Sequence, residues 1–353
     1  MRQRMTGWTR GRCLGITLLV GGSVLLAAIP LGAAGYFGSP RGSETFEGAV
    51  GVPSGTHCTV GKNPHTPAYD PVDRDIYVPN SGSGNLSILS DSCKLVKTIT
   101  FPSGAQPNTA AFDPENNTVY VTDSELNQVY VLSGSKLVGT VTCVCFDSPW
   151  GIAYDPFDQM MVVANANSNT VAFLLSSEEY SASIVGSSPR NLAWDPTLGC
   201  MEVSNSGSNS VSSLCGGIPY FTGTRYTVPV GADPVGVVFA PGAGLDFVAN
   251  AGSDNVSIIN PGSQGSLVYT VPSEVSVGSQ PRDLAWDQAA SSVFVVNYGS
   301  NNISEIHVSY DTDTVTKTLA GPAGAGLFGI AYCDATGQVF VTGYDNDQVY
   351  VYG

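Results

Sequence analysis

The sequence has few charged residues. They make up 12% of its 353 residues, against about 25% in an ordinary globular protein. Helices on a protein surface need Lys, Glu, Arg and Gln on their solvent face, so long surface helices are not expected. Val, Tyr, Thr, Ser, Asn and Gly fill the chain instead, and these residues favour strands and turns. A hydrophobic content of 42% is ample for a folded core and excludes global disorder.

Basic residues are the scarcest charged type. Lys and Arg number 14 against 29 Asp and Glu, which gives a net charge of −15. Five of the 14 lie at or before Arg41, so the rest of the chain has only nine. Nucleic-acid binding requires clustered Lys and Arg to neutralise phosphates, and we therefore expect no nucleic-acid partner.

The N-terminus has the charge pattern of an export signal. Residues 1–12 contain four arginines and no acid, and residues 13–37 carry no charge. Positive charge before an apolar run directs the following chain out of the cytoplasm. The apolar run is long enough to span a bilayer, while Gly32, Ala33 and Ala34 resemble a cleavage site. Residues 1–37 are therefore predicted to be a signal peptide or an N-terminal membrane anchor, followed by a linker at 38–47 and an extracellular or cell-surface domain.

Export makes the cysteines candidates for disulfides. Seven follow Cys13, so at least one stays unpaired within the chain. Cys200 and Cys215 flank a predicted hairpin and should face each other across it, which makes them a disulfide candidate. The pairing of the others stays open: Cys58, Cys93, Cys143, Cys145 and Cys333. Cys143-Val144-Cys145 has the spacing of a soft-metal site but no neighbouring histidine, and we expect no metal or cofactor.

An internal repeat dominates the sequence. A motif of small, aromatic, Asp and Pro residues, with weakened later copies, recurs seven times at spacings of 40 to 47 residues, with the aromatic at Tyr69, Phe112, Tyr154, Trp194, Phe239, Trp286 and Tyr332. Each copy is followed by two more short apolar runs separated by Gly, Ser, Asn and Asp, and all but the last by a third. Four short strands per repeat of this length predict a β-propeller blade.

The chain ends indicate how the ring closes. The seventh copy stops after its third strand at Gly353, while an extra strand-like segment, residues 57–61, precedes the first copy. This segment can supply the missing fourth strand and remove both sheet edges. The sequence therefore predicts one all-β domain over residues 48–353: a seven-bladed β-propeller of four-stranded antiparallel blades whose last blade is closed by an N-terminal strand.

The repeat resembles a known family. Tyr-Val-Thr-Asp at 120–123 and Tyr-Val-Pro-Asn at 77–80 follow aromatic-Asp-Pro strands and precede further short strands, one of which begins Asn-Leu-Ser. This pattern is similar to the YVTN-type, NHL-like β-propeller repeats of archaeal and bacterial cell-surface proteins, over about residues 44–353. The resemblance implies the fold but no particular function, since related propellers include lactonases and lyases.

Function is expected where the blades differ. The residue that opens each innermost strand, usually just after a proline, should line one mouth of the ring. In blade order these residues are His65, Asn108, Trp150, Arg190, Val235, Arg282 and Phe328. Arginine can bind a carboxylate through paired hydrogen bonds, and aromatic rings can stack on a sugar. All of these residues except Val235 are ligand-binding candidates. Alternatively, the arginines pair with local acids such as Asp283, and His65 is a surface loop histidine.

Four sequons make Asn85, Asn116, Asn255 and Asn302 candidates for glycosylation. Three of them occupy the same position of the repeat, before the third strand, so they are alternatively by-products of the repeat.

The functional expectation is a monomeric, non-enzymatic binding module for a protein or polysaccharide of the cell envelope. Only three histidines occur, and no metalloprotease or nucleophile-elbow motif is present. The first alternative is a lactonase- or lyase-like enzyme, which requires His65, Arg190 and Arg282 to converge at the mouth. The second is a structural envelope component that self-assembles.

Overall fold

The computed structural model describes residues 55–174, 180–216, 226–261, 270–309 and 313–353. The contacts divide the chain into Met1–Ala34 and Gly35–Gly353, and every described residue belongs to the second unit. The predicted export segment and linker lie outside the described residues. The described residues contain no apolar helix of membrane-spanning length.

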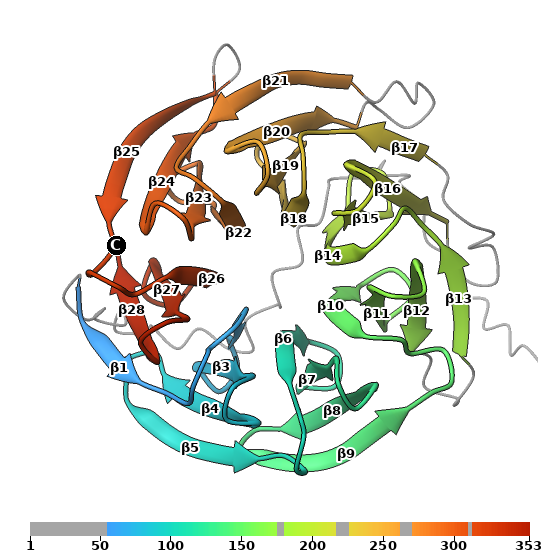
Figure 1. The fold of residues 1–353 in the computed structure, drawn as a ribbon, viewed down its shortest axis with the longest axis vertical. Coiled ribbons are helices and arrows are strands. Elements are labelled where there is room, and N and C mark those ends of the chain that lie inside the picture. Colours follow the sequence, from blue (N-terminus) through green and yellow to red (C-terminus); the bar gives the residue numbers. More distant parts are fainter. Residues whose placement is uncertain (1–54, 175–179, 217–225, 262–269, 310–312) are drawn as a thin grey trace, which may run out of the picture. The chain divides into compact units, whose positions relative to one another are not determined.

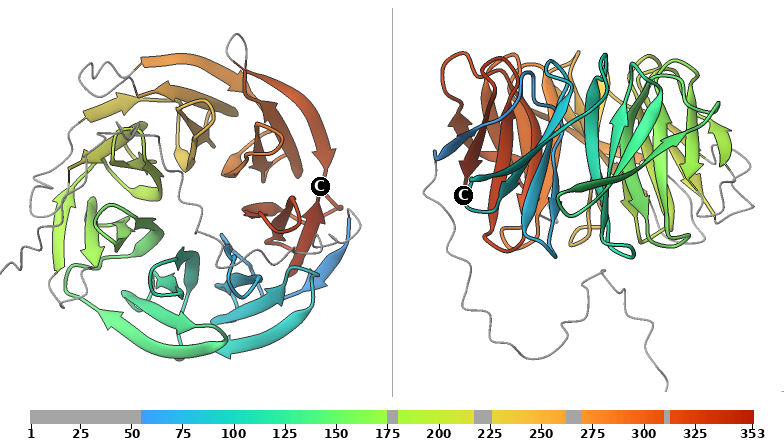
Figure 2. Two further views of the ribbon diagram at one scale, coloured as in Figure 1. Left: turned by 180° about the vertical axis from the view of Figure 1, so that it is seen from behind. Right: turned by 90° about the horizontal axis from the view of Figure 1, so that it is seen from below.

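Seven four-stranded antiparallel sheets are arranged around a central axis, as predicted (Figures 1 and 2). Blade 1 contains β2 (Ala68–Asp70), β3 (Asp75–Asn80), β4 (Asn85–Ser90) and β5 (Leu95–Thr100). Blade 2 contains β6 (Pro107–Asp113), β7 (Thr118–Asp123), β8 (Gln128–Ser133) and β9 (Lys136–Thr142). Blade 3 contains β10 (Pro149–Asp155), β11 (Met160–Asn165), β12 (Thr170–Leu174) and β13 (Tyr180–Ile184).

The later blades repeat this order. Blade 4 contains β14 (Pro189–Asp195), β15 (Cys200–Asn205), β16 (Ser210–Cys215) and β17 (Tyr226–Pro229). Blade 5 contains β18 (Pro234–Ala240), β19 (Leu245–Asn250), β20 (Asn255–Asn260) and β21 (Thr270–Ser276). Blade 6 contains β22 (Pro281–Asp287), β23 (Ser292–Asn297), β24 (Asn302–His307) and β25 (Thr314–Ala320). Blade 7 contains β26 (Leu327–Cys333), β27 (Gln338–Gly343), β28 (Gln348–Tyr352) and β1 (His57–Thr59).

Burial across a blade explains the low charge of the sequence. Every residue of the second strands β15 and β23 is buried, because neighbouring blades cover both faces of the sheet. The outermost strands β5 and β9 are mostly exposed. Charge is therefore tolerated at the outer strands and turns, whereas the middle of each blade must be apolar or hydrogen-bonded.

The N-terminal strand closes the ring, as the repeat count predicted. β1 pairs antiparallel with β28, with His57 opposite Tyr350 and Thr59 opposite Gln348. Blade 7 thus has the same four strands as the others, although its outer strand comes from the opposite end of the described chain. β28 consequently has no open edge along these residues.

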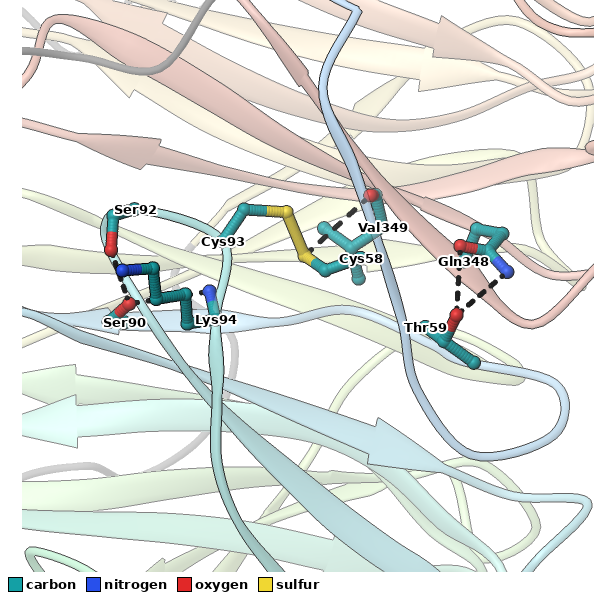
Figure 3. Close-up of a disulfide and its surroundings, with 8 residues drawn as sticks. All are labelled: Cys58, Thr59, Ser90, Ser92, Cys93, Lys94, Gln348 and Val349. Carbon is teal, nitrogen blue, oxygen red and sulfur yellow. Dashed lines mark hydrogen bonds between the residues drawn. A yellow bond between two sulfur atoms is a disulfide. The ribbon is translucent and has the colours of Figure 1, made fainter.

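A disulfide joins this closing strand to the next blade. Cys58 on β1 is bonded to Cys93, which lies in the turn between β4 and β5 of blade 1, with 5.6 Å between the Cα atoms (Figure 3). The Cys58 sulfur also lies 3.8 Å from the Val349 carbonyl oxygen of β28. Blades 7 and 1 are therefore linked covalently where the ring closes.

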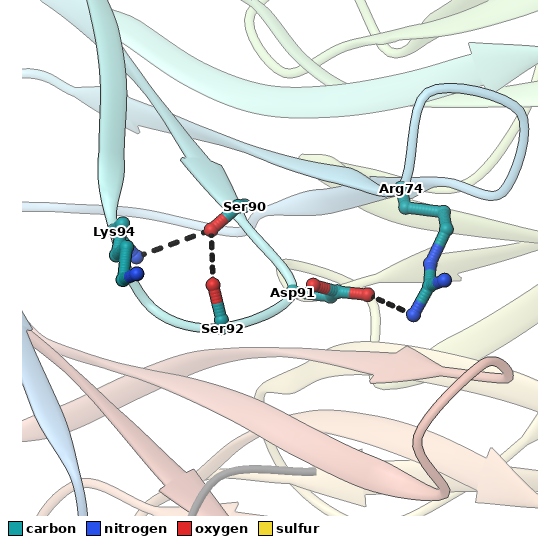
Figure 4. A network of polar contacts seen from close by, with 5 residues as sticks. All are labelled: Arg74, Ser90, Asp91, Ser92 and Lys94. Atoms are coloured by element: carbon teal, nitrogen blue, oxygen red, sulfur yellow. Dashed lines mark hydrogen bonds and ion pairs between the residues drawn. The ribbon is translucent and has the colours of Figure 1, made fainter. Parts of the chain in front are cut away.

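Local polar contacts shape the turn that carries Cys93. Arg74 forms an ion pair with Asp91, and the Ser90 and Ser92 hydroxyl groups are 2.8 Å apart (Figure 4). The Cys93 amide donates to the Ser90 carbonyl at 2.9 Å, and Cys93 has a left-handed φ of 58°. Left-handed backbone in a residue other than glycine persists only where surrounding contacts hold it. The turn thus presents the Cys93 sulfur toward β1.

Two further disulfides are local: one lies within blade 4 and the other in the segment between β9 of blade 2 and β10 of blade 3. Cys200 and Cys215, the pair expected from the hairpin, are bonded between β15 and β16. Cys143 and Cys145 are bonded to each other, and Cys333 has a free, buried thiol. Several disulfides are typical of proteins from oxidising compartments.

Candidate functional site

The backbone just before several innermost strands is held by the preceding blade. In blade 3, Ser148 has a left-handed φ of 54°, and its amide donates to Asn127 Oδ1 of blade 2 at 2.7 Å. The same contact recurs from Ser188 to Asn169 at 2.8 Å, and Asn63 donates to Asp347 of blade 7 at 3.0 Å. The preceding blade therefore fixes where blades 1, 3 and 4 begin, including across the ring closure.

A bulge follows each of these points. In blade 3 the register shifts between Pro149 and Ile152, so Trp150 and Gly151 have no partner residue on β11. A Cβ atom on Gly151 would lie 2.1 Å from the Arg190 carbonyl oxygen of blade 4, so only glycine fits there. The Trp150 carbonyl accepts a hydrogen bond from Thr122 of blade 2 at 2.6 Å. At this end of blade 3, the backbone that carries Trp150 is therefore packed against blade 4 and hydrogen-bonded to blade 2.

Three of the candidate side chains converge across this end of the ring. The His65 ring centroid lies 4.7 Å from that of Phe328 and 5.8 Å from that of Trp150. His65 and Phe328 belong to neighbouring blades, but His65 and Trp150 belong to blades 1 and 3, which are not adjacent. Their contact means that these side chains reach toward the central axis rather than lying each on its own blade.

The two arginines extend this group. The Arg190 guanidinium carbon lies 4.5 Å from the centroid of Trp150, within the range of cation–π attraction. Arg190 Nε also donates to the Ser206 hydroxyl at 3.3 Å. The Arg282 guanidinium carbon lies 5.8 Å from the ring of Tyr298. Within the described residues neither arginine forms an ion pair, and Arg282 Nε is buried without a hydrogen-bond partner.

Two aromatic residues of the site were missed from the sequence. The Tyr344 ring lies 5.3 Å from His65 and 5.2 Å from Phe328, and Tyr298 lies 6.2 Å from Phe328. Both tyrosines directly follow the second strand, where the other blades have only serine or alanine: Ser81, Ser124, Ala166, Ser206 and Ala251. The exchange of a small residue for tyrosine in blades 6 and 7 was a usable signal.

These contacts define one group, which we call the mouth cluster: His65, Trp150, Arg190, Arg282, Tyr298, Phe328 and Tyr344. It draws on blades 1, 3, 4, 6 and 7. The structure thus brings five of the six predicted ligand-binding candidates together. Asn108 is buried, and its side chain donates to the Gln106 carbonyl at 3.1 Å, so its observed role is to hold the local backbone.

The alternative pairing of Arg282 with Asp283 is wrong. Asp283 is buried and forms no ion pair with Arg282. Its carboxylate instead accepts hydrogen bonds from the Leu284 amide at 3.0 Å and from the Ile330 amide of blade 7 at 3.2 Å. Burial raises the pKa of Asp283 to about 7, partly offset by these amide donors. The guanidinium of Arg282 consequently stays available to a ligand.

The alternative that His65 is a surface residue is also wrong. His65 is 6% exposed, and desolvation lowers its pKa to about 4. The imidazole is therefore neutral at physiological pH, and the positive charge of the mouth cluster comes from its two arginines. Burial, followed by the charge of Arg282, also lowers the pKa of Arg190, with Asp233 opposing the shift.

The buried His65 predicts acid sensitivity. The unfolded chain takes up a proton near pH 6.5 and the folded chain only near pH 4, so folding stability falls as pH drops through this window. A His65→Phe variant keeps an aromatic ring but cannot titrate. Between pH 6.5 and 4, the wild type should lose about 3 kcal/mol more unfolding free energy than the variant. Denaturant unfolding at both pH values measures this.

The difference between the wild type and the His65→Phe variant isolates the contribution of His65 to the pH dependence of stability. Buried carboxyl groups such as Asp283 and Asp155 have raised pKa values and act in the opposite direction, but they are present in both chains. Parallel stability curves for the wild type and the His65→Phe variant over this range would contradict the assigned burial of His65.

Three of the sequons are part of the hairpin structure. Asn80 Nδ2 donates to Asn85 Oδ1 at 2.9 Å and to Ser87 Oγ at 3.1 Å, so both sequon residues of blade 1 are engaged. Asn250 and Asn297 make the same pair of contacts in blades 5 and 6. In these three blades both polar residues of Asn-x-Ser thus make hydrogen bonds within the hairpin itself. Asn116 instead lies exposed in the Asp113 turn and donates to that carboxylate at 2.8 Å. Glycosylation of the four remains a prediction.

Comparisons with known proteins support the fold. No family model matches the sequence, and no curated protein matches it either. Among solved structures, a streptogramin B lyase is 15% identical with a TM-score of 0.69, covering 82% of this chain and 93% of the lyase. A virginiamycin B lyase from Staphylococcus aureus is 12% identical with a TM-score of 0.70, covering 84% of this chain and 98% of the lyase.

A protein of unknown function from Desulfotomaculum acetoxidans DSM 771 is 17% identical with a TM-score of 0.66, covering 77% of this chain and 90% of that one. At such identities these likenesses establish the propeller architecture alone. The YVTN-type resemblance of the repeats stays a prediction.

Proposed function

We propose that this propeller is an exported binding module that holds a carboxylate-bearing ligand of the cell envelope at the mouth cluster. The observation that carries the proposal is the pair of arginines without acidic partners among the described residues, each beside an aromatic ring. Guanidinium groups bind carboxylates through two parallel hydrogen bonds. The adjoining rings offer flat apolar surface for a sugar or an aromatic side chain.

The charge distribution supports an anionic ligand at this place. The chain has a net charge of −15, and only nine basic residues follow Arg41. Two of these nine lie in the mouth cluster, close enough for the Arg282 charge to lower the pKa of Arg190. Such mutual repulsion is relieved when an anion binds between the two groups.

The ligand's carboxylate can belong to a uronic-acid polysaccharide or to an acidic peptide. Titration of the full chain with an oligogalacturonate, a neutral glucan oligomer and an acidic peptide separates the two sources. We expect saturable binding of one carboxylate ligand and none of the neutral oligomer. Equal binding of the neutral oligomer, or binding of none of the three, would count against the proposal.

A lyase-like enzyme is the second candidate. Its support is the likeness to lyase structures, the presence of His65, Arg190 and Arg282 in one cluster, and the neighbouring residue Asp283, whose pKa is raised to about 7. Against it, His65 is enclosed by three rings and has a pKa of about 4, which suits a packing role. Incubation with a streptogramin B distinguishes the candidates, since turnover that is lost in an Asp283→Asn variant would favour the enzyme.

A further inference from the structure

Three buried carboxyl groups meet between blades 4 and 5, away from the mouth cluster. Asp195 ends β14, Glu202 lies on β15 and Asp246 lies on β19, and each is 0% exposed. One oxygen from each lies within 4.8 Å of the others. Carboxylates placed this close without water or a counter-charge repel one another strongly.

The oxygen atoms of this group lack partners. Both carboxylate oxygens of Asp246, Oε1 of Glu202 and Oδ2 of Asp195 are buried without a hydrogen-bond partner. Ser213 donates to the other oxygen of Glu202, and the Thr197 amide donates to Asp195 Oδ1 at 2.7 Å. In the described residues the only ion pair is that of Arg74 with Asp91, so no basic side chain compensates the group. Buried polar atoms are normally satisfied, and this concentration of exceptions requires a partner.

The repeat shows that the two residues on the second strands are departures from a rule. At the position of Glu202 the other blades have Tyr77, Tyr120, Val162, Phe247, Phe294 and Phe340. At the position of Asp246 they have Ile76, Val119, Met161, Met201, Val293 and Val339. Two carboxyl groups thus replace aromatic or aliphatic side chains in neighbouring blades, facing the same interface, and together they complete a group with the ordinary turn aspartate of blade 4.

We propose that blades 4 and 5 hold a calcium-sized divalent cation between them, bound by Asp195, Glu202 and Asp246. Calcium takes oxygen ligands at about 2.3 to 2.6 Å, so donor atoms within 4.8 Å of one another can all reach one ion. Magnesium gives up its waters reluctantly and usually keeps several of them, which a group of three fully buried carboxyl groups disfavours. The ion connects the two blades and supplies the missing partner for the carboxylate oxygens.

The test compares the full chain, purified in mild detergent, with a repeat-based variant. The change Glu202→Val with Asp246→Met inserts the residues that blade 3 has at these positions, Val162 and Met161. The wild type should retain about one calcium per chain by elemental analysis. Its melting temperature should rise with the logarithm of free Ca²⁺ and fall in chelator. The double variant should contain no calcium and should not respond to Ca²⁺ or chelator.

Asp155→Asn is the matched control. Asp155 has the same turn position in blade 3, is equally buried, accepts the Phe157 amide at 2.8 Å and has an unpartnered Oδ2, but has no carboxylate companions of this kind. Its variant should respond to Ca²⁺ as the wild type does. If the apolar double variant fails to fold, Glu202→Gln with Asp246→Asn provides the same comparison with nearly unchanged shape.

Two results would overturn the proposal. A wild type without bound calcium, whose melting temperature is the same in Ca²⁺ and in chelator, would mean that the three carboxyl groups are accommodated by protons alone. Equal stabilisation by Mg²⁺ and Ca²⁺ would remove the assignment to a calcium-sized ion. The mouth cluster takes no part in this experiment, so its outcome is independent of the proposed function.

Discussion

Replacing Cys58 and Cys93 together by alanine should lower the free energy of unfolding by about 4 kcal/mol. The disulfide joins residues 35 positions apart, and cross-linking a loop of this length reduces the entropy of the unfolded chain by about that amount. The closing strand β1 has only three residues and three paired positions, so its own hydrogen bonds contribute little. Denaturant unfolding followed by circular dichroism measures the loss.

The effect should be located at the ring closure. Cys58 and Cys93 pack in one apolar cluster with Val349 and Val351 of β28 and Phe340 of β27. Detachment of β1 would expose the edge of β28 and part of this cluster, so amide hydrogen exchange should increase first along β28. The double alanine variant also leaves no thiol of this pair to react with the free Cys333 in the same cluster.

A second disulfide provides the control. Cys143 and Cys145 are only two positions apart, so their bond barely restricts the unfolded chain. Replacing both by alanine should change the free energy of unfolding far less. If the two double variants are destabilised equally, the Cys58–Cys93 bond is not the covalent closure of the ring that its position indicates.

Replacing Arg190 and Arg282 together by alanine should weaken binding of a carboxylate ligand by at least about a hundredfold. A hydrogen bond to a charged group contributes about 1.5 to 3 kcal/mol, and each 1.4 kcal/mol corresponds to a factor of ten in affinity. The folded chain should lose little stability, because neither arginine forms an ion pair among the described residues, and their contacts are with Ser206 and the rings of Trp150 and Tyr298. Calorimetric titration and thermal unfolding of the same samples measure both quantities.

Two further variants distinguish the recognition mode. Arg190→Lys with Arg282→Lys keeps both charges but loses the planar guanidinium, and should give intermediate affinity if the bonds are paired. Arg74→Ala removes an arginine that is already bonded to Asp91, in a turn at the other end of the innermost strands. It should leave the affinity unchanged. Equal loss of affinity in Arg74→Ala and in the double alanine variant would indicate a general charge effect rather than a site.

The fold could be predicted almost completely because the repeat is a periodic signal. Seven copies of the aromatic motif, five of them with Asp after the aromatic residue, are visible in the sequence together with their spacings and the extra segment before the first copy. They determine the blades and the closing strand. The pairing of Cys58 with Cys93 was not predictable, since it depends on a left-handed turn residue and on contacts between blades 7 and 1. The Cys200–Cys215 pairing depends only on one local hairpin, so it could be expected.

The candidate site was only partly predictable for the same reason. The position after the proline identified five members of the mouth cluster, but how far each side chain reaches over the axis depends on the bulges. Tyr298 and Tyr344 come from another strand of the blade and were visible only as departures from small residues. Glu202 and Asp246 are departures of the same kind at buried positions. In a repeat protein, a charged residue at a position that is aromatic or aliphatic in the other repeats is therefore as useful a signal for a functional site as a variable loop residue.

Carboxylate binding by Arg190 and Arg282 is tested most directly by a fluorescence titration that monitors Trp150. The ring of Trp150 lies 4.5 Å from the Arg190 guanidinium carbon. A carboxylate ligand bound by the arginines must change the surroundings of this ring. We expect a saturable change with the carboxylate ligand that is absent with the neutral oligomer and absent in the Arg190→Ala, Arg282→Ala double variant. The same titration of a Trp150→Phe variant shows which part of the fluorescence change comes from Trp150, because that part is lost in the variant. Unchanged binding in the double arginine variant would contradict the account.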